Sequence, residues 1–291
     1  MDTLTPHVYV EPGYRGCTVG AIATARGVIC VDTPLLPSEA RHWQARIEAV
    51  IGAPVIYTIY TDGHRDRVLG TQWLGGQAVA HEATWEKLRS YGDAIRQQVI
   101  EYLAHHGETT AAEELARSLQ LYLPELTIGA GSTLTLCHER PQVVIRAVGG
   151  ATPGSLWVEL PDQGVVFAGD LVTQNTHPFM SEANTASWLA RLEELRAHQY
   201  FASKIVPGRG NGYRRSDMQK TLNYLQDMRE QVQLIMRERR GKFDASELLA
   251  KFAGRFPIPN DEHERIHRRV RVGLEKVYEE LKTEKRRKKR A

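Results

Sequence analysis

One short loop concentrates the residues that are best suited to chemistry. The stretch "TDGHRDRVLG" contains Asp62, His64 and Asp66, and it directly follows the apolar run "APVIYTIY". Such a run is typical of a buried strand, and open α/β sheets place their chemistry beyond the carboxyl ends of their strands. Carboxylates and an imidazole this close together are typical metal ligands. The same loop contains Arg65 and Arg67, whose guanidinium groups offer no lone pair to a cation.

Short strands separated by turns must position this loop. The segments "HVYVEP", "CTVGAIAT" and "GVICVDT" are rich in β-branched residues and bounded by Gly or Pro, and "PVIYTIY" and "QAVAH" continue the series. A helix is predicted over 38–50, where Trp43, Ile47 and Val50 share one face. A second series of strands, "TLTLC", "QVVIRAV", "SLWVEL", "GVVFAGD" and "KIVPG", is followed by more helices. Two β-rich halves with helices after each predict an α+β fold in which two sheets pack together.

Helical segments interrupt and end this pattern. Residues 82–123 are predicted to be helical with a break at "HHGETT", and this insert would form a wall or lid beside the site. A last helix with one apolar face is predicted over 262–282. We therefore predict one domain over 1–240, C-terminal helices packed on it over 241–281, and a basic, disordered tail over 282–291.

Composition narrows the class of protein. The chain has 291 residues and a net charge of +3, which is too small to imply a polyanionic partner. Its three cysteines, Cys17, Cys30 and Cys137, have no CxxC spacing, which favours buried, reduced thiols. The N-terminus lacks the features of a signal peptide, and no stretch reaches the roughly 20 apolar residues that cross a bilayer. These observations predict a cytoplasmic protein without a membrane partner.

Six motifs, in order, resemble those of the metallo-β-lactamase fold. They are "VICVDT", "TDGHRDRVLG", "AVAHEAT", "GGATPGSLW", "VVFAGDLV" and "IVPGRGNGY". The resemblance covers about 7–214 and is to the broad hydrolase branch with a helical insert after the first site motif. It implies a four-layer αββα sandwich with that insert and added C-terminal helices. It also implies a pair of zinc ions held by seven ligands, which together activate a water for hydrolysis.

Carried onto this chain, the family's ligand set is only partly kept. The seven positions fall on Asp62, His64, Asp66, Arg67, Ala151, Asp170 and Arg209. Three of these residues have the expected type, and Asp62 is a carboxylate in place of a histidine. Arg67, Ala151 and Arg209 replace histidines and cannot be ligands, because alanine has no donor atom and arginine stays protonated. The resemblance therefore predicts a dismantled binuclear site.

The replacements compensate charge. Without metal, Asp66 and Asp170 would be buried acids with no counter-charge, which costs several kcal/mol for each ion. Arg67 and Arg209 occupy the positions nearest these acids in the family's arrangement. We predict that their guanidinium groups replace the second metal in a structural cluster of salt bridges.

The first functional interpretation is a pseudoenzyme that binds an unknown small molecule or anion in its cleft, without a cofactor. Arg65, Arg67 and Arg209 could form a pocket for phosphate or carboxylate, since guanidinium forks match such groups. The neighbouring acids, Asp62, Asp66 and Asp170, would weaken the positive electrostatic field of these arginines.

Two alternatives remain open. The first is a hydrolase of esters, thioesters or lactones with one zinc, iron or manganese ion on Asp62, His64 and Asp170. The second is an interaction protein that binds nucleic acid through the tail over 282–291. Metal analysis of the purified protein tests the first alternative, and deletion of the tail tests the second.

Overall fold

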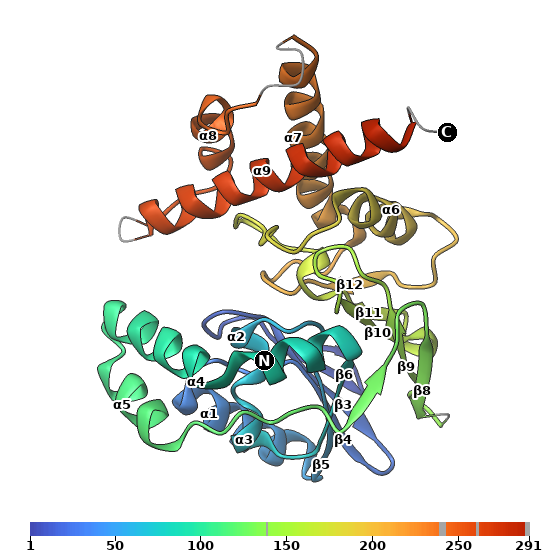
Figure 1. The fold of residues 1–291 in the computed structure, drawn as a ribbon. Coiled ribbons are helices and arrows are strands. Elements are labelled where there is room, and N and C mark those ends of the chain that lie inside the picture. Colours follow the sequence, from blue (N-terminus) through green and yellow to red (C-terminus); the bar gives the residue numbers. More distant parts are fainter. Residues whose placement is uncertain (138, 239–242, 260–261, 289–291) are drawn as a thin grey trace.

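Two sheets pack face to face between layers of helices (Figure 1). The computed structural model describes residues 1–137, 139–238, 243–259 and 262–288. The first sheet has seven strands in sequence order, antiparallel from β1 to β4 and parallel from β4 to β7. Its strands are β1 (Asp2–Thr5), β2 (Val8–Glu11), β3 (Val19–Thr24), β4 (Gly27–Val31), β5 (Val55–Ile59), β6 (Gln77–His81) and β7 (Leu126–Ile128).

The second sheet has five strands in the order β12-β11-β10-β9-β8. The chain pairs antiparallel from β8 to β11, and β12 adds to β11 in parallel. Its strands are β8 (Thr133–Cys137), β9 (Val143–Ala147), β10 (Leu156–Leu160), β11 (Val165–Phe167) and β12 (Lys204–Val206). Gly20 in β3 lies directly against the ring of Phe167 in β11, where a Cβ atom would clash. This close approach joins the two sheets across an apolar core that both of them supply.

Helices cover the outer faces of both sheets. The first sheet is covered by α1 (Pro37–Ile51), α3 (Thr71–Leu74), α4 (Glu82–His105) and α5 (Thr109–Ser118). The second sheet is covered by α6 (Thr185–Arg196). Beyond it, α7 (Gln219–Glu238), α8 (Ser246–Ala253) and α9 (His263–Lys288) pack together, and these helices share one apolar cluster with the sheet (Figure 1). The predicted four-layer α+β sandwich with a helical insert and C-terminal helices is confirmed. Among the described residues, no helix has the length and apolar character needed to cross a membrane.

The last helix continues further than the sequence predicts. The sequence analysis ends this helix near 282 and expects disorder over 282–291, whereas α9 extends to Lys288. Arg229 of α7 contacts Glu280 at 3.2 Å and Glu284 at 2.9 Å. These ion pairs, on a partly buried arginine, hold the basic end of α9 against the domain. Residues 289–291 lie outside the described part of the chain.

Candidate functional site

Segments from both sheets meet at the candidate site around Asp62 and Asp170. Asp62 follows β5 of the first sheet, and the short helix α2 (Arg65–Val68) begins three residues later. Asp170 lies in the turn after β11, and Arg209 follows β12, both in the second sheet. Between the sheets, the Leu156 N–H donates to the Thr61 carbonyl at 2.8 Å. The site therefore lies at the carboxyl ends of strands, where the sequence analysis places it.

Arg67 is fully buried, with 0% of its surface exposed, and lies among three carboxylates. Its Nη1 atom donates to Asp32 Oδ2 at 2.6 Å, and its Nε atom lies 3.3 Å from Asp62 Oδ2. Its Nη2 atom donates to Asp170 Oδ1. Gly208 permits this approach, because a Cβ atom there would lie only 2.5 Å from Arg67 Nη2. One guanidinium thus supplies the positive charge at the centre of the cluster.

Arg209 joins the outer part of the same cluster. Its Nε and Nη2 atoms donate to Asp170 Oδ1 and Oδ2, each at 3.1 Å, in a bidentate pair. Its Nη1 atom donates to Asp66 Oδ2 at 2.7 Å and also to the Gly16 carbonyl. Its guanidinium carbon lies 4.8 Å from the ring centre of Phe179. Both oxygens of Asp170 are therefore already bound by arginine.

His64 adds a third cation. Its Nδ1 atom lies 2.9 Å from Asp62 Oδ1 and 3.2 Å from Asp170 Oδ2. Burial lowers the pKa of His64, but Asp62 and Asp170 outweigh burial and raise the pKa to about 9. The imidazole is therefore protonated at neutral pH. With Arg67 and Arg209 it sets three positive charges against four buried or half-buried carboxylates.

The acids respond differently to this arrangement. Burial raises the pKa of Asp170, yet Arg209 and Arg67 hold it well below its usual range. The pKa of Asp66 is also lowered, because Arg209 outweighs burial. Burial raises the pKa of Asp32 to about 6 even though Arg67 opposes the shift. Asp32 is thus the acid least well compensated in the cluster.

The raised pKa of His64 predicts a loss of stability in alkali. The unfolded imidazole has a pKa near 6.5 and the folded one about 9, so the His64 contribution is complete below about pH 6.5. The contribution disappears as the pH rises through about 9. We expect the free energy of unfolding to fall by about 1 to 3 kcal/mol across this window. Urea titrations of chelator-treated protein between pH 6 and pH 9.5 measure the change, and His64→Gln should remove most of it.

The structure brings six of the seven candidate residues together and places Ala151 in an apolar environment. Ala151 is 1% exposed and belongs to the cluster that includes Leu171 and Trp188. The sequence analysis does not assign Asp32 to the site, although Asp32 belongs to one of the six motifs, "VICVDT". Its backbone is left-handed, with φ of 58°, and its carboxylate also accepts hydrogen bonds from the Thr61 backbone at 2.8 Å and hydroxyl at 2.7 Å.

A cavity of about 350 Å³ opens beside the ion cluster. Its wall is formed by the site loop, by α4, by the Phe179 segment and by the first turns of α9. The lining residues are Gly16, Leu35, His64, Arg65, Asp66, Tyr91, Ile95, Gln98, Tyr102, Phe179, Arg209, Glu262, Arg265 and Arg269. The predicted insert thus forms one wall of the cleft, and α9 forms another.

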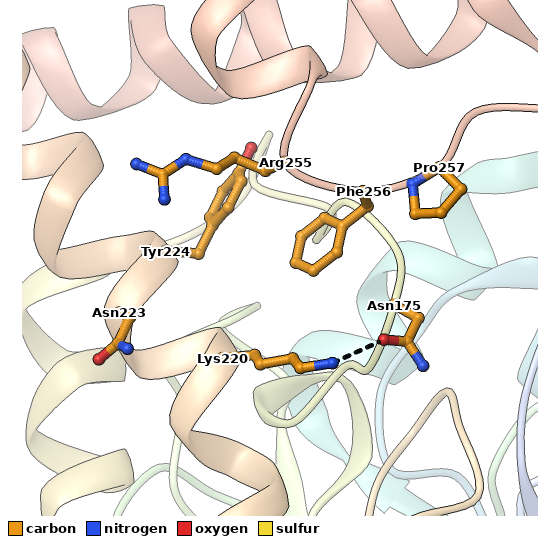
Figure 2. A pocket seen from close by; sticks show the side chains of 7 residues that line it. All are labelled: Asn175, Lys220, Asn223, Tyr224, Arg255, Phe256 and Pro257. Carbon is orange, nitrogen blue, oxygen red and sulfur yellow. Dashed lines mark hydrogen bonds between the residues drawn. The ribbon is translucent and has the colours of Figure 1, made fainter.

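A second cavity, of about 330 Å³, lies between α7 and the segment after α8 (Figure 2). Tyr224 and Phe256 stack there with ring centres 5.8 Å apart. The Lys220 ammonium donates to Asn175 Oδ1 at 3.1 Å, and Arg255 pairs with Asp227 outside the lining. The cations of this cavity therefore already have partners, and its lining includes none of the acids of the ion cluster.

A sandwich of two sheets with the site at their strand ends defines the metallo-β-lactamase type of fold. The sequence profile of the metallo-beta-lactamase superfamily matches residues 12–230. The chain belongs to this superfamily. No curated protein matches the sequence.

Solved structures agree on the fold. A metallo-beta-lactamase family protein from Thermus thermophilus is 19% identical with a TM-score of 0.67, over 97% of this chain and 95% of that one. A metallo-beta-lactamase from Pontibacter korlensis is 20% identical with a TM-score of 0.58, over 77% and 97%. The Thermus structure therefore extends the likeness through the C-terminal helices.

The residues present do not fit the binuclear zinc centre that the superfamily implies. A second metal would need ligands at positions 67 and 209, where guanidinium groups lie on the carboxylates instead. Each cation would also stand beside a permanent positive charge. The residues fit a single metal ion better, because one ligand atom from each of Asp62, His64 and Asp170 lies within 4.8 Å of the other two. The Asp62 Oδ2 and His64 Nδ1 atoms are buried and make ion-pair contacts, with Arg67 Nε and with the Asp62 and Asp170 carboxylates, but no well-directed hydrogen bond among the described residues.

Proposed function

We propose that this chain is a pseudoenzyme of the metallo-β-lactamase superfamily, in which an arginine-centred ion cluster replaces the metals and the cleft serves binding or regulation. One observation carries the proposal: the Arg67 guanidinium lies buried among Asp32, Asp62 and Asp170. A fixed guanidinium can neutralise these acids and hold their loops together, but it cannot carry an activated water. The cavity beside the cluster remains available to a ligand.

Metal analysis tests the proposal. We expect protein purified without chelator to contain well below one equivalent of zinc, iron or manganese, because the acids already have cationic partners. Phenyl ester, thioester and lactone substrates should be hydrolysed no faster than in buffer, with or without added metal. Bound metal near one equivalent, together with hydrolysis, would overturn the pseudoenzyme.

The mononuclear hydrolase is the second candidate, and the close spacing of Asp62, His64 and Asp170 favours it. Metal binding there would have to displace the His64 proton and compete with Arg67 and Arg209 for the Asp170 oxygens. The same analysis separates the candidates. One equivalent of metal that is lost in His64→Ala supports the hydrolase.

A further inference from the structure

Two arginines in the wall of the cleft cavity have no carboxylate partner among the described residues. Of the four arginines that line it, Arg209 pairs with Asp66 and Asp170, and Arg265 pairs with Glu262 at 2.8 Å. Within the described parts of the chain, neither Arg65 nor Arg269 has a carboxylate within ion-pair distance. The wall therefore carries two guanidinium charges that the described residues do not neutralise.

Aromatic rings hold these two guanidinium groups in place. The Arg269 guanidinium carbon lies 3.7 Å from the ring centre of Phe179, whose ring also faces Arg209. Arg65 lies 5.0 Å from the ring centre of Tyr102, and Arg265 lies 4.5 Å from it. A guanidinium that contacts a ring keeps its N–H groups free for an anion. The two cations are thus positioned before a ligand arrives.

Arg269 experiences electrostatic repulsion from two other arginines. Burial lowers its pKa to about 10, and Arg209 and Arg265 act in the same direction. Its one hydrogen bond in the described structure goes to the His177 carbonyl at 3.2 Å. An anion beside Arg269 would relieve this repulsion and take up the remaining N–H groups.

We propose that the cleft cavity binds a small organic carboxylate with an apolar or aromatic body, and that Arg269 and Arg65 bind its carboxylate. The assignment rests on the proposed function, because it takes the cleft as a binding site. Phe179, Tyr91 and Tyr102 line the cavity and are only partly buried, so their rings supply apolar surface for the body of the ligand. A cavity of about 350 Å³ is within the usual range for a small-molecule site.

The wall suits an anionic head group. Asp66 and Glu262 also line the cavity, but Arg209 and Arg265 pair with them, so Arg65 and Arg269 leave the wall with a net positive charge. Guanidinium forks bind carboxylates in a bidentate manner, so one arginine can hold the whole head group.

Isothermal titration calorimetry on the full chain tests the assignment with three probes: 4-phenylbutanoate, the neutral 4-phenylbutan-1-ol and phenyl phosphate. We expect 4-phenylbutanoate to bind about tenfold or more tightly than the alcohol, because only the acid forms charge-assisted hydrogen bonds. Arg269→Gln should weaken its binding about tenfold, and Arg65→Gln about threefold. Lys220→Gln, in the second cavity, is the matched control and should leave binding unchanged.

Three results would overturn the assignment: equal binding of acid and alcohol, tighter binding of phenyl phosphate, or full affinity in both arginine variants. Absence of 4-phenylbutanoate binding at millimolar concentration would also overturn it. Circular dichroism checks that each variant is folded. If Arg269→Gln does not fold, the affinity of Arg65→Gln for 4-phenylbutanoate tests the assignment. Metal content is measured in the same samples, so that the two proposals can fail separately. Bound metal would contradict the pseudoenzyme, whereas unchanged affinity for 4-phenylbutanoate in the arginine variants would contradict the carboxylate site.

Discussion

Replacing Arg67 with methionine should lower the free energy of unfolding by about 3 to 5 kcal/mol. The substitution keeps a long side chain but removes the charge that lies among Asp32, Asp62 and Asp170. These three carboxylates are buried, and a buried charge that loses its partner is strongly destabilising. In a chain of this size, the loss corresponds to a melting temperature lower by about 5 to 8 °C, which differential scanning calorimetry measures.

Arg65→Met provides the matched control for this prediction. Arg65 lies in the same loop, but it contacts the Tyr102 ring instead of a carboxylate, so its loss should cost less than about 1 kcal/mol. Adding Asp32→Asn to Arg67→Met should recover part of the stability, because it removes one of the stranded acids. A melting temperature of Arg67→Met within about 2 °C of the wild-type value would show that the cluster contributes little to stability.

Only part of the site is visible in local residue types. A strand end followed by Asp62, His64 and Asp66 stands within ten residues, whereas Asp170 and Arg209 are assigned to the site through the resemblance to the metallo-β-lactamase fold, which also places the arginines beside the acids. The individual partners needed the structure. The sequence analysis sets Arg67 and Arg209 against Asp66 and Asp170, and the structure pairs Arg67 with Asp170 and Arg209 with both acids. It adds Asp32 and Asp62 as further partners of Arg67.

Other parts of the site depend on long-range packing, which no local pattern encodes. Asp32 reaches the cluster because β4 pairs in parallel with β5, and the Asp32 N–H donates to the Ile59 carbonyl at 2.8 Å. Arg269 belongs to a helix whose apolar face was predicted, but periodicity does not say which end of that helix lies beside the cleft. The ion pairs of Arg229 with Glu280 and Glu284 near the end of α9 also join distant parts of the chain, so the sequence analysis does not predict them.

Restoring two histidines should restore a metal site. In the double variant Arg67→His with Arg209→His, both imidazoles that the resemblance requires for the second metal return beside Asp66 and Asp170. Without metal, we expect this variant to be destabilised about as much as Arg67→Met, because the same acids lose their counter-charges. Zinc should then bind at about one equivalent and restore about 4 kcal/mol at a thousandfold excess over its Kd. Elemental analysis and the zinc-dependent shift in melting temperature measure both effects.

The matched control is Arg67→Gln with Arg209→Gln, which removes the same two charges without supplying imidazoles. It should be as unstable as the histidine variant and should not respond to zinc. Adding Asp170→Asn to the histidine variant should abolish its zinc response, because Asp170 is the carboxylate that both guanidinium groups now contact. A histidine variant that binds no more zinc than the wild-type chain would mean that the arginines did not take the place of a metal. Rescue by zinc would show that guanidinium and metal perform the same structural task here, namely neutralising buried acids at the strand ends.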